Sequence, residues 1–258
     1  MKKALSVPTP DFHHGLLAVP ASREDISGFS LLDNPIWHAL STTHKSFAGG
    51  NDLAKRYPSD VTPLSAMTGQ SGAAYDALRE IVHPDDTAAL FLDSPPLLPP
   101  NWILSRTFEI HQMTFEAPQP TNEQGMLETL TKADIPQMLE LTQLTEPGPF
   151  RRRTSELGTY LGIFSPERRL AALAGERLRL TGFTEISAVC THPDYRGKGY
   201  ARSLISALAS NIIRRKEIPF LHVKADNAAA IGLYESLEFK FRASLHLTVI
   251  KNAESPVH

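Results

Sequence analysis

The residues best suited to chemistry lie in one short segment, Arg196–Ala201, which reads RGKGYA. Gly197 and Gly199 allow the positive-φ backbone in which successive N–H groups point at one place. An amphipathic helix predicted over 204–215 follows, and the unpaired N–H groups of a helix's first turn attract negative charge. The arginine and the lysine of the segment add full positive charges. The segment therefore predicts a site for an anion, typically phosphate or pyrophosphate.

Two common phosphate-binding patterns do not fit this segment. A P-loop would need glycine at 192 and serine or threonine at 199, where the chain has His192 and Gly199. A dinucleotide-binding fingerprint would need glycine at 202, where the chain has Arg202. Taken alone, the segment is more typical of a plain strand-to-helix turn that uses its glycines for tightness.

With its flanks, the segment resembles the acyl-CoA-binding motif of the GNAT superfamily of acyltransferases, [QR]xxGx[GA]. The matching residues follow His192-Pro193-Asp194-Tyr195, and they are Arg196, Gly197, Lys198, Gly199, Tyr200 and Ala201. The resemblance implies that the backbone amides of this turn hold the CoA pyrophosphate. It also implies that the preceding strand, at Val189, Cys190 and Thr191, pairs with pantetheine as an added strand would.

A second GNAT-like motif lies downstream. Asn227, Ala230 and Tyr234 match the asparagine, small residue and tyrosine of a short helix in that family. Seven residues are close to two helical turns, so Asn227 and Tyr234 share a face, with Ala230 leaving room for a ligand. The family's usual LGF is Leu237-Glu238-Phe239 here. The resemblance covers about 126–251 and implies acetyl transfer from acetyl-CoA to an amine, directly and without a metal.

The resemblance also implies catalytic roles for two residues. Glu185 lies 11 residues before Arg196, where some GNAT enzymes carry the general base, and the alternative is a solvated charge at a strand end. Tyr234 is the expected acid, because a phenol can return a proton to a departing thiolate. Glu176 is a lesser candidate for the base. We expect Cys190 to pack as a buried hydrophobe and not to carry the acyl group.

Prolines divide the chain: 16 of the 20 lie before residue 150. Since proline interrupts regular structure, we expect an irregular, motif-poor segment at 1–116, which resembles a degenerate GNAT-like half. A linker is predicted at 117–125 and the GNAT domain at 126–251. In the first part, Asn34-Pro35 predicts a helix start. A helix at 72–82 and strands at 87–93 and 102–115 follow.

In the second part strands and helices alternate, and a hairpin turn is predicted at 165–169. The predicted strands cover 126–131, the end of 154–164, 170–180, 185–191, 220–225 and 244–250, and the predicted helices cover 132–144, 204–215 and 227–237. The fold class is therefore α/β (α+β), and the resemblance implies a mixed, mostly antiparallel central sheet flanked by helices.

The composition limits the classes of partner that we expect the protein to bind. The net charge of −2 gives no reason to expect a nucleic acid, although the basic runs 151–153 and 214–216 keep that alternative open. The single cysteine excludes an internal disulfide, and no apolar run is long enough for a membrane span. We expect a cytoplasmic monomer or homodimer that acetylates a small amine or amino acid, held near Thr142–Arg153. A CoA-binding sensor or interaction protein without catalysis is the alternative function.

Overall fold

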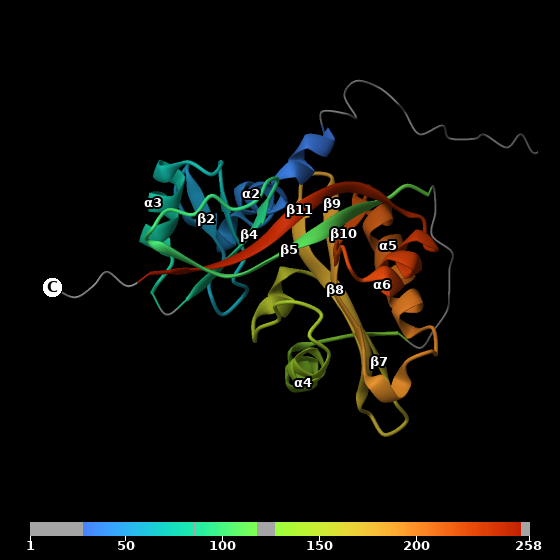
Figure 1. The fold of residues 1–258 in the computed structure, drawn as a ribbon. Coiled ribbons are helices and arrows are strands. Elements are labelled where there is room, and N and C mark those ends of the chain that lie inside the picture. Colours follow the sequence, from blue (N-terminus) through green and yellow to red (C-terminus); the bar gives the residue numbers. More distant parts are fainter. Residues whose placement is uncertain (1–27, 85, 118–126, 254–258) are drawn as a thin grey trace, which may run out of the picture.

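The structure is a computed structural model that describes residues 28–84, 86–117 and 127–253. Its centre is an eight-stranded sheet in the order β4-β11-β5-β10-β9-β8-β7-β6 (Figure 1). All neighbouring strands run antiparallel except β9 and β10. The strands are β4 Thr87–Leu92, β5 Trp102–Phe115, β6 Glu128–Thr129, β7 Tyr160–Phe164, β8 Leu170–Leu180, β9 Phe183–Thr191, β10 Ile218–Lys224 and β11 Phe239–Asn252. The mixed, mostly antiparallel sheet predicted from the sequence is confirmed.

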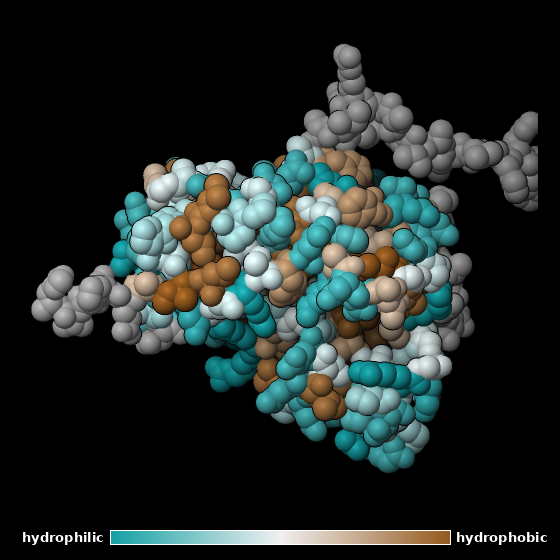
Figure 2. All heavy atoms as spheres, in the orientation of Figure 1, coloured by the Kyte–Doolittle hydropathy of each residue, from teal (hydrophilic) through white to brown (hydrophobic). Residues whose placement is uncertain are grey.

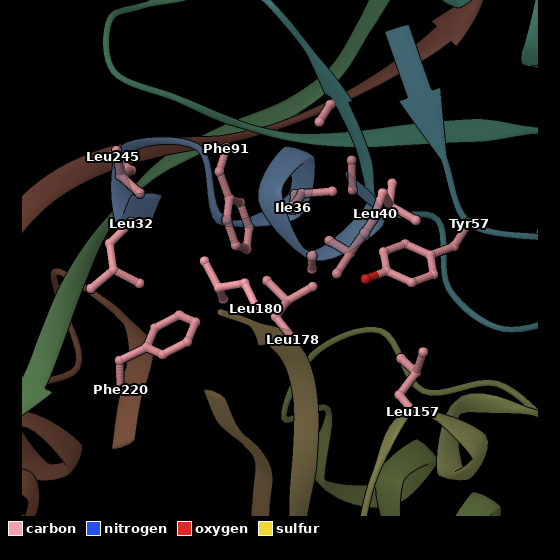
Figure 3. Packing of buried hydrophobic residues seen from close by; sticks show 14 of the residues in the cluster. Leu32, Ile36, Leu40, Tyr57, Phe91, Leu157, Leu178, Leu180, Phe220 and Leu245 are labelled. Atoms are coloured by element: carbon pink, nitrogen blue, oxygen red, sulfur yellow. The ribbon is translucent and has the colours of Figure 1, made fainter. Parts of the chain in front are cut away.

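Helices cover both faces of this sheet. On one face, α5 (Tyr200–Arg214) and α6 (Ala228–Glu235) pack through residues such as Leu208 and Tyr234 on apolar side chains of the central strands. On the other face lie α2 (Pro35–Ser41) and α4 (Ile135–Thr145). Figure 3 shows the core beneath α2, where Ile36 and Leu40 point toward Leu178 and Leu180 of β8. The sheet is therefore the middle layer of three.

Local sequence explains where the helices begin. Asn34 caps α2 by accepting a hydrogen bond from the backbone N–H of Trp37 at 3.3 Å, and proline occupies the first helical position, as predicted. Ser71 caps α3 (Gly72–Ile81) in the same way. α5 begins four residues earlier than its apolar pattern suggested, because Gly199 at φ +77° is its N-cap.

Two predicted details differ from the structure. The helix predicted to start at Asn34-Pro35 is short, because α2 ends at Ser41 and a separate 3-10 helix, Lys45–Phe47, follows. A small sheet of β1 (Gly49–Gly50), β2 (Ala54–Arg56) and β3 (Ser65–Met67) was not predicted. Strands of two or three residues are too short to show an alternating pattern.

The segments on either side of the predicted linker share the main sheet. β5 lies between β11 and β10, and β4 forms the edge beside β11. Apart from Ala117, the predicted linker lies outside the described residues, as do residues 1–27. The division of the chain into 1–116 and 126–251 stays a prediction, but strands from both parts build the sheet that carries the candidate site.

The face of the molecule shown in Figure 2 is mostly polar. Figure 2 shows hydrophilic side chains over most of one face and hydrophobic ones in separate patches, one of them over the end that carries α3. Among the described helices, none has the length and apolar character that a membrane span requires.

Candidate active site

The sheet opens between β9 and β10. Their parallel pairing runs from Phe183 with Ile218 to Glu185 with Phe220 and goes no further. Beyond Glu185, the β10 side of β9 has no partner strand among the described residues. An unpaired strand edge offers backbone N–H and C=O groups to an extended ligand. Val189, Cys190 and Thr191 lie on this part of β9 and line a cavity of about 790 Å3.

A β-bulge bends β9 at the same place. Leu173 of β8 is opposite Cys190, and Gly175 is opposite Ser187, so Ala188 and Val189 together face one residue of β8. Ala188 has φ +54°, a left-handed conformation that costs a non-glycine residue about 1 kcal/mol. Bulges redirect the backbone groups of a strand, often at functional sites. The sequence contains no signal for this bulge.

The glycine turn lies on the wall of the 790 Å3 cavity. Gly197 and Gly199 have φ values of +76° and +77°, the conformation that the spacing predicted. Both glycines are exposed, as are Arg196 and Lys198, and the turn leads directly into α5. The N-terminus of α5 and the two cations therefore give this end of the cavity a positive potential.

Helix α6 lines the same cavity. The side-chain oxygen of Asn227 accepts a hydrogen bond from the N–H of Ala230 at 3.1 Å, so Asn227 caps its own helix. One cavity thus brings together Tyr234 and every residue that the sequence predicted for the cofactor: Val189, Cys190, Thr191, Arg196, Gly197, Lys198, Gly199, Tyr200, Ala201, Asn227 and Ala230. Their roles stay predictions.

Burial sets the chemistry of two of these side chains. Tyr234 is 8% exposed, and desolvation raises the pKa of its phenol to about 12. Burial also raises the pKa of the Cys190 thiol to about 11, with Thr145 partly opposing the shift. Both groups therefore stay protonated at neutral pH: the tyrosine is a possible proton donor, and the cysteine is a poor nucleophile.

Glu185 lies at the base of the split, fully buried, and is not among the residues that line the cavity. Its carboxylate accepts hydrogen bonds from Nε and Nη2 of Arg177 at 2.8 and 2.6 Å and from Nδ1 of His222 at 2.7 Å. Burial alone would raise its pKa, but the charge of Arg177 and these hydrogen bonds lower the pKa to about 2. The lesser candidate, Glu176, pairs instead with Arg215 at 2.9 Å.

A second cavity, of about 130 Å3, adjoins the first. Glu146, Val189, Lys224 and Tyr234 are among the residues that line both. The acceptor segment predicted at Thr142–Arg153 contributes Glu146 to Pro149 to its lining.

The arginines of that segment lie elsewhere. Arg153 pairs with Asp60 and Glu156, and Arg151 lies 3.9 Å from Asp86. Neither arginine lines the smaller cavity. Of their three acidic partners, Asp60 and Asp86 belong to the first part of the chain and Glu156 to the second.

Sequence reasoning missed Arg177 and His222, which line the smaller cavity beside Glu185. A histidine on the buried side of a predicted strand was the one available signal, and it has no motif spacing to Glu185. Because the two residues lie 37 positions apart and meet only through the pairing of β9 with β10, the contact follows from topology.

Comparisons with known proteins show which family and fold the chain resembles. Residues 160–247 match the model of the FR47-like protein family. A Yersinia pestis acetyltransferase is 45% identical over 58 residues, which cover 22% of this chain and 40% of that relative. The chain thus aligns with well under two thirds of the curated relative's length. A GCN5-related N-acetyltransferase from Kribbella flavida shares the fold, with a TM-score of 0.56 at 14% identity, over 83% of this chain and 93% of that one.

The similarity to one solved structure extends over both parts of the chain. It is a GNAT-family structure from Novosphingobium aromaticivorans, 33% identical, with a TM-score of 0.81 over 86% of this chain and 99% of that one. An alignment that covers 86% of this chain includes residues on both sides of the predicted linker. The chain therefore belongs to the GNAT family of acetyltransferases.

Proposed function

We propose that the protein transfers an acetyl group from acetyl-CoA to a small amine, directly and in a ternary complex. The observation that carries the proposal is the unpaired edge of β9, which faces the 790 Å3 cavity and leads to the Arg196–Ala201 turn. An extended chain with amide groups suits the strand edge. A pyrophosphate suits the N-terminus of α5 with Arg196 and Lys198 beside it.

The chemistry needs a neutral amine and a protonated leaving group. The amine lone pair attacks the thioester carbonyl, so that a C–N bond forms and the C–S bond breaks. Tyr234 gives its phenolic proton to the sulfur, and the proton lost by the amine returns to the phenolate through water. The backbone N–H groups at the bulge, near Val189, polarise the carbonyl. The products are the acetylated amine and the free CoA thiol, and Cys190 carries no acyl group.

We assign Glu185 a positioning role within this reaction. A carboxylate with a pKa of about 2 is far too weak a base to hold a proton from an alkylammonium ion, whose pKa is about 10. By accepting from Nδ1 of His222, Glu185 fixes the tautomer in which Nε2 of that ring is an acceptor. Gln112 donates to Nε2 at 3.0 Å, which locks the ring against the smaller cavity.

The test is release of free CoA thiol from acetyl-CoA in the presence of a panel of amines and amino acids. We expect amine-dependent thiol release matched by an equal amount of acetylated amine. Binding of acetyl-CoA without thiol release on any acceptor would favour the catalytically inactive CoA sensor. The cytoplasmic location and the monomeric or dimeric state remain predictions from the sequence.

A further inference from the structure

The smaller cavity has an apolar wall, most of which the first part of the chain provides. Phe91 of β4 is opposite Leu247 of β11, which is opposite Phe108 of β5, so the three side chains form a row across neighbouring strands. Leu64 and Ile110 extend this surface, and all five line the cavity. Figure 3 shows Phe91 pointing down toward the core beneath α2, which anchors the wall.

Arg177 and His222 bring no unpaired charge to the smaller cavity. The guanidinium of Arg177 is paired with the Glu185 carboxylate, and the ring of His222 lies 4.5 Å from the Phe91 ring, centroid to centroid. Burial lowers the pKa of His222, so this ring is neutral at pH 7. A charged ligand group buried beside Arg177 and His222 would therefore find no unpaired counter-ion there. Nothing would offset the free-energy cost of removing its water.

The other two charged residues, Glu146 and Lys224, have opposite signs and line both cavities. The ammonium of Lys224 lies 5.0 Å from the centre of the Phe108 ring. A charged group of a ligand thus meets both signs at the junction with the larger cavity and an apolar surface further in.

The size of the cavity limits what fits. A volume of about 130 Å3 is close to that of an apolar cavity of ~150 Å3 known to hold benzene. Tyr234 and Val223 belong to the hydrophobic cluster on the α5 side of the sheet, whereas Phe91 and Ile110 belong to the cluster on the α2 side. The cavity therefore passes through the gap where β9 and β10 separate, and its apolar end points away from the turn at Arg196–Ala201.

From this geometry we propose that the smaller cavity holds the side group of the acyl acceptor, and that the acceptor is a primary amine carrying a small uncharged apolar group, such as a phenyl ring or a branched alkyl chain. The proposal rests on the acetyltransferase function proposed above. The amine nitrogen then lies near Tyr234 and the bulge of β9, at the junction of the two cavities. The methyl of an acetyl group is too small to need this wall.

The first experiment compares acceptors with acetyl-CoA as donor. We expect kcat/KM for 2-phenylethylamine and isopentylamine to exceed that for ethylamine by about ten- to a hundredfold, the range that apolar pocket contacts give. Spermidine and phenylalanine, which carry further charges, should be poorer than 2-phenylethylamine. A preference for either of these charged acceptors would overturn the proposal while leaving the acetyltransferase function intact. So would hexanoyl-CoA outperforming acetyl-CoA with ethylamine, because the cavity would then serve the acyl chain.

The second experiment uses Phe108→Ala, at a half-buried position on the wall. Its kcat/KM should fall at least tenfold with 2-phenylethylamine and less than threefold with ethylamine. Phe241→Ala is the matched control: this phenylalanine also lies in the long strand pair β5–β11, is 56% exposed and does not line the cavity. Equal losses with both amines in Phe108→Ala would contradict the proposal.

A binding measurement separates this inference from the proposed function. Calorimetric titration of 2-phenylethylamine into the CoA-loaded protein needs no turnover. If no amine releases thiol, the proposed function fails, yet saturable binding that is weakened at least tenfold by Phe108→Ala and unchanged by Phe241→Ala still supports the cavity assignment. Absence of saturable binding to the CoA-loaded protein would overturn it.

Discussion

At the scale of single residues, Tyr234 is restricted to one direction of proton transfer. With a pKa raised to about 12, its phenol is protonated at neutral pH, so it can donate a proton but cannot begin as a base. Its position on the wall shared by the two cavities places it where donor and acceptor would meet.

We predict that Tyr234→Phe lowers kcat about a hundredfold, the effect typical of losing a general acid, because the ring is kept and the proton is lost. The dissociation constant of acetyl-CoA, measured by calorimetry, should change less than threefold. A fall in affinity with unchanged kcat would show that the hydroxyl binds the donor and is not the acid.

Glu185 gives a prediction about stability. Glu185→Gln leaves Arg177 buried without its counter-charge, which costs roughly 3–5 kcal/mol for a buried pair. Urea unfolding should show this loss. The double variant Arg177→Met/Glu185→Leu should recover most of it, because no unpaired charge then remains. If the single and the double variant are equally unstable, the ion pair is not the cause.

At the scale of elements, the turn before α5 can be tested without steric change. A Cβ added at Gly197 would meet no atom within 4 Å, so alanine there is disfavoured only by φ +76°. We predict that Gly197→Ala costs about 1 kcal/mol of stability and weakens acetyl-CoA binding at least tenfold, because the N–H groups no longer converge. Calorimetric titration of acetyl-CoA and urea unfolding measure the two effects.

Gly182 is the matched control for this prediction. It has φ +80° in the turn between β8 and β9, and an added Cβ would also meet nothing within 4 Å. Gly182→Ala should lose the same stability and keep its affinity for acetyl-CoA. A similar loss of affinity in both variants would mean that general destabilisation, and not the turn, weakens binding.

The strands and helices also show how much of the fold and of the candidate site can be predicted from the sequence. β8 was predicted with its observed bounds and β4 to within a residue, because alternation and flanking turn residues are local signals. The glycine turn and the motif of α6 could be placed in one site because each is a short motif with fixed spacing. The bulge at Ala188 and the contact between Glu185 and His222 could not, since both depend on strand pairing that no local pattern encodes.

At the scale of the whole molecule, the first part of the chain helps to build both the central sheet and the candidate site. It contributes β4 and β5 to the central sheet and most of the apolar wall of the smaller cavity. A buried contact also joins the two parts: Nδ1 of His44 lies 2.8 Å from the hydroxyl of Tyr57, and Nε2 lies 3.2 Å from the carbonyl oxygen of Leu157. Since a carbonyl only accepts, Nε2 donates to Leu157, and Nδ1 accepts from Tyr57.

This contact makes the stability of the molecule depend on pH. Burial is the main cause that lowers the pKa of His44, from 6.5 to about 4. The hydrogen bond to Leu157 acts in the opposite direction, and the charge of Arg179 lowers the pKa further. Above pH 6.5 neither the folded nor the unfolded state binds this proton. Between pH 6.5 and 4 the unfolded state is protonated at His44 while the folded state is not. Acidification over this range therefore lowers the free energy of unfolding by roughly 3 kcal/mol. Urea unfolding at pH 7 and pH 4.5 should show most of this loss in the wild type and a smaller loss in His44→Gln. His246→Gln, on β11 and outside this contact, should follow the wild type, and an unchanged pH dependence in His44→Gln would rule out His44 as the source.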